Sequence, residues 1–272
     1  MFEKIQHIGY LVGDLDAAVS WYGDHFGGEN AGGGDLPAGR VVASGGRNAF
    51  VHFGKVEVEL IEPIDKSNLS PGSLVMHHVG YVVTDIEAAI SDLKSKEFKF
   101  LADAPNVNVL GQKVLYFDPS CTNGVMIHLT ELPSQPNSIG LDAGVKVDHI
   151  VHAGYLVGDL DNAVDWYVQK FGGVHIGGGA SRRGSRNAFV NFGQVQVELI
   201  EPTDPAALGL SHEMDHVGYS VLDIQSEIIS CKEKGLSFVA DVANTNSVSQ
   251  QVLYFETEST MGSRMHLTQL PA

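Results

Sequence analysis

Histidine and glutamate residues recur at corresponding places in the two halves of this 272-residue sequence. In the first half, His7 and His78 each lie in a short β-branched and aromatic run, and His128 lies in a later run of the same kind. In VEVELIE the side chains of a strand alternate between two faces, so Glu57 and Glu59 share the face opposite the valines. Imidazole nitrogens with one carboxylate suit Zn, Ni, Co, Fe or Mn better than Mg or Ca. The first half therefore contains the donors of one divalent metal site.

The second half repeats this donor set in the same order. Fifty positions separate His78 from His128, and fifty again separate His216 from His266. Taken alone, any one of these histidines would be interpreted as a hydrogen-bonded structural residue, but duplication by itself does not explain a Glu and a His in equivalent closing strands. We therefore predict a divalent transition metal, Zn, Ni, Co, Fe or Mn, at up to two sites per chain. The predicted ligands are His7, Glu59, His78 and His128 in the first half, and His152, Glu198, His216 and His266 in the second.

The elements that must position these residues form a repeat within a repeat. RNAFVHFGKVEVELIEP from Arg47 matches RNAFVNFGQVQVELIEP from Arg186, and HIGYLVGDLDAAV from His7 resembles HVGYVVTDIEAAI from His78. Each of four copies opens with a strand pattern, continues with an amphipathic helix and ends in further strands. The module reads βαβββ, which predicts an α+β fold. An aspartate suited to capping the helix follows each opening strand: Asp14, Asp85, Asp159 and Asp223.

A stretch rich in Pro, Gly and Ser separates the two halves. It predicts a first domain at 1–134, a linker at 135–146 and a second domain at 147–272, with two modules in each domain. The offset between the halves is 145 residues at His7 and His152 but 139 at Arg47 and Arg186. The six missing residues fall in a glycine-rich stretch, which we therefore predict to be a loop.

Composition excludes several classes of partner and function. The chain is 43% hydrophobic and 18% charged, with a formal net charge of −16 that disfavours nucleic acid and anionic membranes as partners. It has no apolar run of about 18 residues and no secretory pattern at its beginning. Cys121 and Cys231 are too few and too far apart for a disulfide scaffold. We expect a cytoplasmic protein that acts on a small molecule.

Polar residues beside the predicted ligands are candidates for catalysis and substrate binding. We predict that proton transfer involves Glu57, Glu59 or Glu198, and that Arg47, Arg186 and Gln196 bind substrate. Arg47 and Arg186 recur in an RN pair, where a structural ion pair is an equally good interpretation. Glu57 and Gln196 share the ligand face, but solvated residues at the rim of a barrel would show the same pattern.

The sequence resembles the vicinal oxygen chelate superfamily, which includes glyoxalase I, methylmalonyl-CoA epimerase, fosfomycin resistance proteins and extradiol dioxygenases. Each half is similar to a two-module epimerase subunit through HIGYLVGDLDAAVSWYGDHFGG, VELIEP, MHHVGYVVTDIEAAISDL and NGVMIHLTELP. The resemblance implies that two modules form an open, cup-shaped eight-stranded barrel with a divalent metal on its concave face. It implies the same eight ligands, and it implies that the tandem halves stand in for a homodimer. We expect a monomeric pseudo-dimer or a homodimer.

Two departures from the family pattern affect the expected activity. Glyoxalase I and the epimerase usually close the last strand with Glu, where this chain has His128 and His266, and no carboxylate stands near Ala43, where an epimerase base would fall. Metal-assisted stabilisation of an enolate-type oxyanion remains available, so we predict an isomerase, epimerase or lyase for a small, anionic, oxygenated substrate. The alternative is a ring-cleaving type of dioxygenase that uses Fe(II) or Mn(II). A non-catalytic binding or resistance protein is the third hypothesis, and retention of all eight ligands weighs against it.

Overall fold

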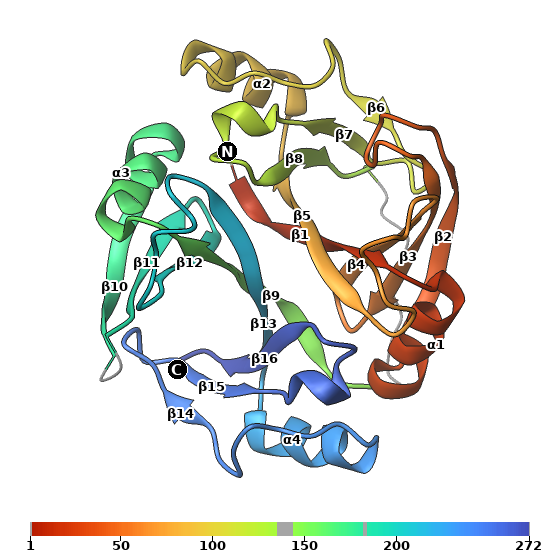
Figure 1. The fold of residues 1–272 in the computed structure, drawn as a ribbon, viewed down its shortest axis with the longest axis vertical. Helices are drawn as coiled ribbons and strands as arrows, with labels where there is room; N and C mark the ends of the chain where they lie inside the picture. The colour runs from red at the N-terminus through yellow and green to blue at the C-terminus, as the bar shows by residue number, and fades with distance from the viewer. Residues whose placement is uncertain (1, 135–143, 182–183, 272) are drawn as a thin grey trace.

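Two open eight-stranded mixed sheets dominate the computed structural model, which describes residues 2–134, 144–181 and 184–271. Each sheet curls into a cup with helices on its outer side (Figure 1). The first half contains β1 (Phe2–Val12), α1 (Leu15–Phe26), β2 (Glu29–Leu36), β3 (Gly46–Phe53), β4 (Val56–Pro63), β5 (Leu74–Val83), α2 (Ile86–Ser95), β6 (Asn106–Val107), β7 (Lys113–Tyr116) and β8 (Met126–Glu131). The second half contains β9 (Val147–Val157), α3 (Leu160–Phe171), β10 (Val174–Ala180), β11 (Arg186–Phe192), β12 (Val195–Glu201), β13 (His212–Val221), α4 (Ile224–Glu233), β14 (Asn244–Thr245), β15 (Gln251–Tyr254) and β16 (Arg264–Gln269).

The order of elements confirms four βαβββ modules and the α+β fold. In the first half the strand order is β2-β3-β4-β1-β5-β8-β7-β6, and β10-β11-β12-β9-β13-β16-β15-β14 repeats it in the second. Within each module the opening and closing strands are parallel, as in β1 with β4 and β5 with β8. The antiparallel pair β1 and β5 joins the two modules of the first half. The centre of each sheet therefore consists of the four strands that carry the predicted ligands.

Local sequence signals account for the helices. The N–H of Ala17 donates to Asp14 at 3.0 Å, and the other three predicted aspartates cap α2, α3 and α4 in the same way. Helix α1 buries Leu15, Ala18, Tyr22 and Phe26, which lie on one face at the helical period. It ends at Gly27, whose φ of 68° is in the left-handed region that favours glycine.

One apolar core runs through both halves behind the two sheets. Phe2 packs edge-on against Phe171 at 5.4 Å between ring centroids, and Phe26 packs against Phe255 at 6.1 Å. Helix α1 thus contributes to the packing of the second half and α3 to that of the first (Figure 1). Among the described helices, none combines the length and apolar character that a membrane crossing needs.

The glycine-rich stretch is only partly the predicted loop. Residues 37–45 connect two strands, but Glu29–Leu36 form the edge strand β2, so the loop prediction is wrong there. A Cβ at Gly33 would lie 2.1 Å from the carbonyl oxygen of Asn48, so the close approach of β2 to β3 requires glycine. Most of the predicted linker, residues 135–143, lies outside the described residues.

Candidate metal centre

Strand pairing brings the four predicted ligands of the first half together on the concave face of its sheet. Gly9 in β1 pairs with both Glu59 in β4 and His78 in β5, and Gly80 pairs with His128 in β8. A Cβ on Gly9 would lie 1.9 Å from the His78 ring. The glycine in the repeated H-x-G-Y pattern therefore leaves room for the imidazole of the neighbouring strand.

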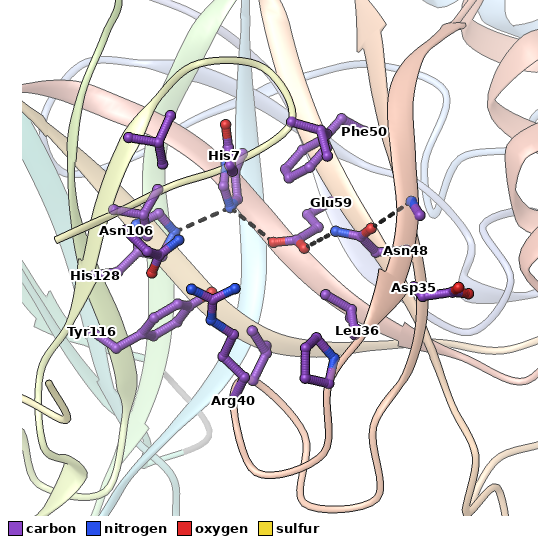
Figure 2. A pocket seen from close by; sticks show the side chains of 17 residues that line it. His7, Asp35, Leu36, Arg40, Asn48, Phe50, Glu59, Asn106, Tyr116 and His128 are labelled. Atoms are coloured by element: carbon purple, nitrogen blue, oxygen red, sulfur yellow. Dashed lines mark hydrogen bonds and ion pairs between the residues drawn. The ribbon is translucent and has the colours of Figure 1, made fainter.

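The donor atoms of these residues converge on one point. His7 Nε2 lies 3.1 Å from His78 Nε2 and 3.1 Å from His128 Nε2. Glu59 Oε2 lies 3.2 Å from His78 Nε2 and 3.6 Å from His7 Nε2. All four side chains are buried, and Figure 2 shows His7, Glu59 and His128 directed toward one another. The three histidines form a group able to hold a metal ion; we call them, with Glu59, the first site.

The hydrogen bonds around the first site show that its residues fit a cation. His7 Nδ1 donates to Glu57 Oε1 at 3.0 Å, and His128 Nδ1 faces the carbonyl oxygen of Leu129 at 3.4 Å. The Glu57 carboxylate only accepts hydrogen bonds, so Nδ1 of His7 carries a proton and its Nε2 faces the other ligands; Nδ1 of His128 also lies 3.0 Å from the Thr130 hydroxyl. Burial and the neighbouring histidines lower the pKa of His78 and His128 well below the usual value. Imidazole nitrogens that converge beside a carboxylate are the donor chemistry of a divalent transition ion.

A second layer of side chains fixes the ligands. Glu57 lies behind His7 and also accepts from His52 Nε2 at 2.8 Å and Gln112 Nε2 at 3.0 Å. Burial raises the pKa of Glu57, but hydrogen bonds from His52 and His7 outweigh it and lower the pKa to about 2. The structure thus places Glu57 against a ligand rather than toward open space. Its predicted role in proton transfer stays a prediction.

Asn48 holds the ligand carboxylate of the first site. Its side-chain nitrogen donates to Glu59 Oε1, and its oxygen accepts from the N–H of Gly34 at 3.1 Å (Figure 2). The adjacent Arg47 points to the other face of β3, where it pairs with Glu62 and Asp16. The repeated RN pair was the signal in the sequence for Asn48, but the sequence-based prediction assigned a role to the arginine and none to the asparagine.

The second site repeats this geometry. His152 Nε2 lies 3.2 Å from His216 Nε2 and 3.1 Å from His266 Nε2, and these three histidines form the second group able to hold a metal ion. Glu198 Oε2 lies 3.2 Å from His216 Nε2. Asn187 donates to Glu198 Oε1 at 2.7 Å, as Asn48 does to Glu59. Arg186 pairs with Glu201 and Asp161, so the structure gives both predicted substrate arginines carboxylate partners and their binding role stays a prediction.

The residues behind the histidines differ between the sites. Gln196 replaces Glu57, lies 3.3 Å from His152 Nδ1 and contacts Asn191 and Gln250. Behind His216, Asp215 takes the place of His77 and lies 2.8 Å from His216 Nδ1. Burial lowers the pKa of His216, but hydrogen bonds to Asp215 and Glu198 outweigh it and raise the pKa. A carboxylate therefore lies behind His7 in the first site, whereas in the second site a carboxylate lies behind His216.

A cavity of about 160 Å³ opens over the first site. His7, Glu59 and His128 form its floor, and Phe50 and Tyr116 lie beside them. Arg40 is the only lysine or arginine among the described residues that line the cavity, and Figure 2 shows its side chain directed toward His128 and Tyr116. Arg40 lies in the connection whose length differs between the two halves, where the repeated pattern is interrupted.

The chain is similar in sequence to known methylmalonyl-CoA epimerases over about half of its length. The chain is 30% identical over 134 residues to the mitochondrial methylmalonyl-CoA epimerase of Mus musculus, which covers 47% of this chain and 72% of that protein. An ethylmalonyl-CoA/methylmalonyl-CoA epimerase of Cereibacter sphaeroides is 27% identical over 139 residues, 48% of this chain and all of that protein.

Two solved structures share the fold over almost the entire chain. A variant of 4-hydroxymandelate synthase from Streptomyces coelicolor matches with a TM-score of 0.70 and 13% identity, over 98% of this chain and 92% of that one. The Mn(II)-bound glyoxalase of Novosphingobium aromaticivorans matches with a TM-score of 0.66 and 13% identity, over 98% and 82%. The model of one family matches both residues 6–116 and residues 151–254. The chain belongs to the glyoxalase, bleomycin resistance protein and dioxygenase superfamily.

Proposed function

We propose that the protein is a divalent-metal-dependent isomerase, epimerase or lyase acting on a small, anionic, oxygenated substrate at the first site. The observation that carries the proposal is the convergence of three imidazoles and one carboxylate beneath a cavity whose lining includes Arg40. A divalent ion held by this set keeps a net positive charge, which favours an anionic substrate. The relatedness to methylmalonyl-CoA epimerases supports chemistry next to a carbonyl group. The predicted ligand His128 closes the strand in which glyoxalase I and the epimerase usually have a glutamate.

We propose a separate role for each residue of the first site. His7, Glu59, His78 and His128 hold the ion, which when bound supplies Lewis-acid stabilisation to a developing oxyanion. Arg40 orients an anionic group of the substrate at the mouth. Tyr116 Oη lies 3.4 Å from His78 Nε2, and burial raises its pKa well above the usual value, so the hydroxyl stays protonated and is available to donate a hydrogen bond to an oxygen of the substrate.

Glu59 is the carboxylate we propose for moving the proton. Asn48 holds its Oε1, and Oε2 is directed at the histidines, so Oε2 would have to leave the ion before it could accept a proton. We assign Glu57 a positioning role, because three donors already occupy it and it lies behind His7. Glu198 is the equivalent candidate in the second site, held in the same way by Asn187.

Metal analysis and proton exchange test this function. Protein expressed with Zn, Mn, Fe, Co and Ni available should retain up to two equivalents of metal, and a His78→Ala, His128→Ala variant should lose one. A panel of small 2-oxo acids is incubated with the metal-loaded protein in D₂O. The acid that is a substrate should incorporate deuterium at the carbon next to its carbonyl group, and proton NMR measures the incorporation. Less than about one equivalent of metal in the wild type, with no loss in the variant, would contradict the metal-dependent function.

The dioxygenase is the second candidate, because an imidazole-rich set suits Fe(II) as well as Zn. It predicts oxygen consumption and loss of activity under anaerobic conditions, whereas the isomerase or lyase is indifferent to oxygen. Both cysteines are free thiols, which suits a reducing compartment such as the cytoplasm. The packing of the two halves through one core supports a monomeric pseudo-dimer.

A further inference from the structure

The two candidate sites share a floor but differ in the residues at the mouth. Each floor combines three histidines, a glutamate held by an asparagine, and a tyrosine at the same place in the seventh strand of its half. The mouth of the first site is formed by the end of β2, the connection that follows it, and the segment around β6.

The mouth of the first site is largely apolar. Leu36, Pro37 and Val41 line it on one side, and Val107 and Val109 line it on the other. Val107 is 64% exposed and Val109 is 65% exposed, although valine is usually buried. Exposed apolar side chains that line a cavity over a metal site indicate that the ligand covers them.

The strand register identifies the counterparts in the second half. Gly34 pairs with Asn48 and Gly179 with Asn187, so Ser181 stands where Leu36 stands. Thr245 pairs with Gln251 as Val107 pairs with Lys113. Two positions later, Ser247 takes the place of Val109.

The connection that contains Pro37, Arg40 and Val41 also differs. Nine residues, 37–45, lie between Leu36 and Gly46 in the first half, but only three, 182–184, lie between the equivalent Ser181 and Ser185 in the second. Residues 182–183 lie outside the described residues. The described counterparts of Leu36, Val107 and Val109 are Ser181, Thr245 and Ser247. Three apolar mouth positions have become hydroxyl-bearing residues while the floor has not changed.

We propose that the first site takes a substrate with an apolar body next to its metal-binding oxygens, and that the second site takes a smaller, polar ligand. The inference rests on the proposed function insofar as both sites must hold a metal. It adds that the two halves of one chain discriminate between ligands by the size of the apolar part. A hydrocarbon ring covering Val107 and Val109 gains affinity in the first site, whereas hydroxyl-bearing Thr245 and Ser247 give no such gain.

Two Mn²⁺-loaded variants isolate the sites. His216→Ala, His266→Ala leaves the first site intact, and His78→Ala, His128→Ala leaves the second. Glycolate and mandelate are the probes, because both present a hydroxyl and a carboxylate oxygen to the metal and differ in a phenyl ring. Mn²⁺ electron paramagnetic resonance and water-proton relaxation measure binding without any need for activity.

The first site should bind mandelate about tenfold more tightly than glycolate, which corresponds to partial burial of a phenyl ring. The second site should bind the two probes within about threefold of each other. Val107→Thr, Val109→Ser should remove the mandelate preference of the first site and leave glycolate binding unchanged. Thr245→Val, Ser247→Val should create a preference in the second, and neither pair alters a ligand or a buried side chain.

The outcomes separate this inference from the proposed function. Equal mandelate preferences in the two sites, or no effect of the valine substitutions, would overturn the inference while the metal-dependent function stands. Absence of bound Mn²⁺ from both isolated sites, in variants whose circular dichroism shows a native fold, would overturn the proposed function and the inference together.

Discussion

Glu57 and Gln196 offer a direct test of how residues behind the ligands control metal affinity. They occupy equivalent positions on β4 and β12, each contacting Nδ1 of the first histidine of its site, at 3.0 Å and 3.3 Å. The substitution Glu57→Gln therefore gives the first site the residue that the second already has. The reverse substitution, Gln196→Glu, gives the second site the carboxylate of the first.

The expected magnitude follows from the change in one hydrogen bond. A hydrogen bond to a charged group contributes about 1.5–3 kcal/mol and a neutral one about 0.5–1.5 kcal/mol. Loss of the charge behind His7 therefore costs about 1–1.5 kcal/mol of metal binding, or roughly tenfold in Kd. This estimate lies at the lower end of the 10–100-fold range typical of residues that orient metal ligands. Gln196→Glu should tighten the second site by a similar factor.

Isothermal titration with Zn²⁺ measures both effects. Glu57→Gln is titrated with the second site removed by His216→Ala, His266→Ala, and Gln196→Glu is titrated with the first site removed by His78→Ala, His128→Ala. The melting temperature of each metal-free variant is the control, because Glu57 is buried and its loss also affects the fold. A Kd within twofold of the parent for both substitutions would refute the reasoning that charge behind the histidine controls affinity.

Three further predictions concern the mouth, the ligand carboxylate and acid stability. Arg40→Ala should weaken oxalate binding to the Mn²⁺-loaded first site about threefold to fivefold, measured by water-proton relaxation, and leave the melting temperature unchanged because Arg40 is exposed. Asn48→Ala should lower the Zn²⁺ affinity of the first site about tenfold by freeing Glu59, whereas the neighbouring Arg47→Ala should not; equal effects would contradict the assignment. Burial lowers the pKa of His212 to about 4, against about 6.5 when unfolded, so the unfolded chain binds a proton first as the pH falls. His212 should therefore contribute a loss of stability of up to about 3 kcal/mol between pH 6.5 and 4, beside the losses from buried His78 and His128. The variant His212→Leu, which has the residue of the first half at this position, should reduce the total loss by about that amount in urea unfolding of metal-free protein.

The repeat and the candidate ligands could be predicted from the sequence because their signals are local or duplicated. A strand alternates its faces every residue, so Glu59 had to share a face with Glu57. The aspartates before the helices needed only their own neighbours to act as caps. The four modules provided independent copies of each pattern, and the modules were confirmed by the structure.

The tertiary structure decided what lies around those ligands. Arg47 and Asn48 are adjacent in the sequence, but one step along a strand sends the asparagine to the metal face and the arginine to the ion pairs outside. Glu57 and Glu59 share a face, yet only the packing of β1 against β4 puts one behind His7 and the other beside it. Such distinctions depend on strand register and on contacts between residues far apart in the chain.

The sequence by itself determined four βαβββ modules and the residue types that could bind a metal, because alternation, capping and repetition act over a few residues. Only the fold decided that His7 Nε2 lies 3.1 Å from Nε2 of both His78 and His128, and that Arg40 lines the cavity over them. The physical reason is that a site is assembled from side chains on separate strands. Their convergence depends on how the sheet curls and which loops close over it, and neither is encoded in any single segment.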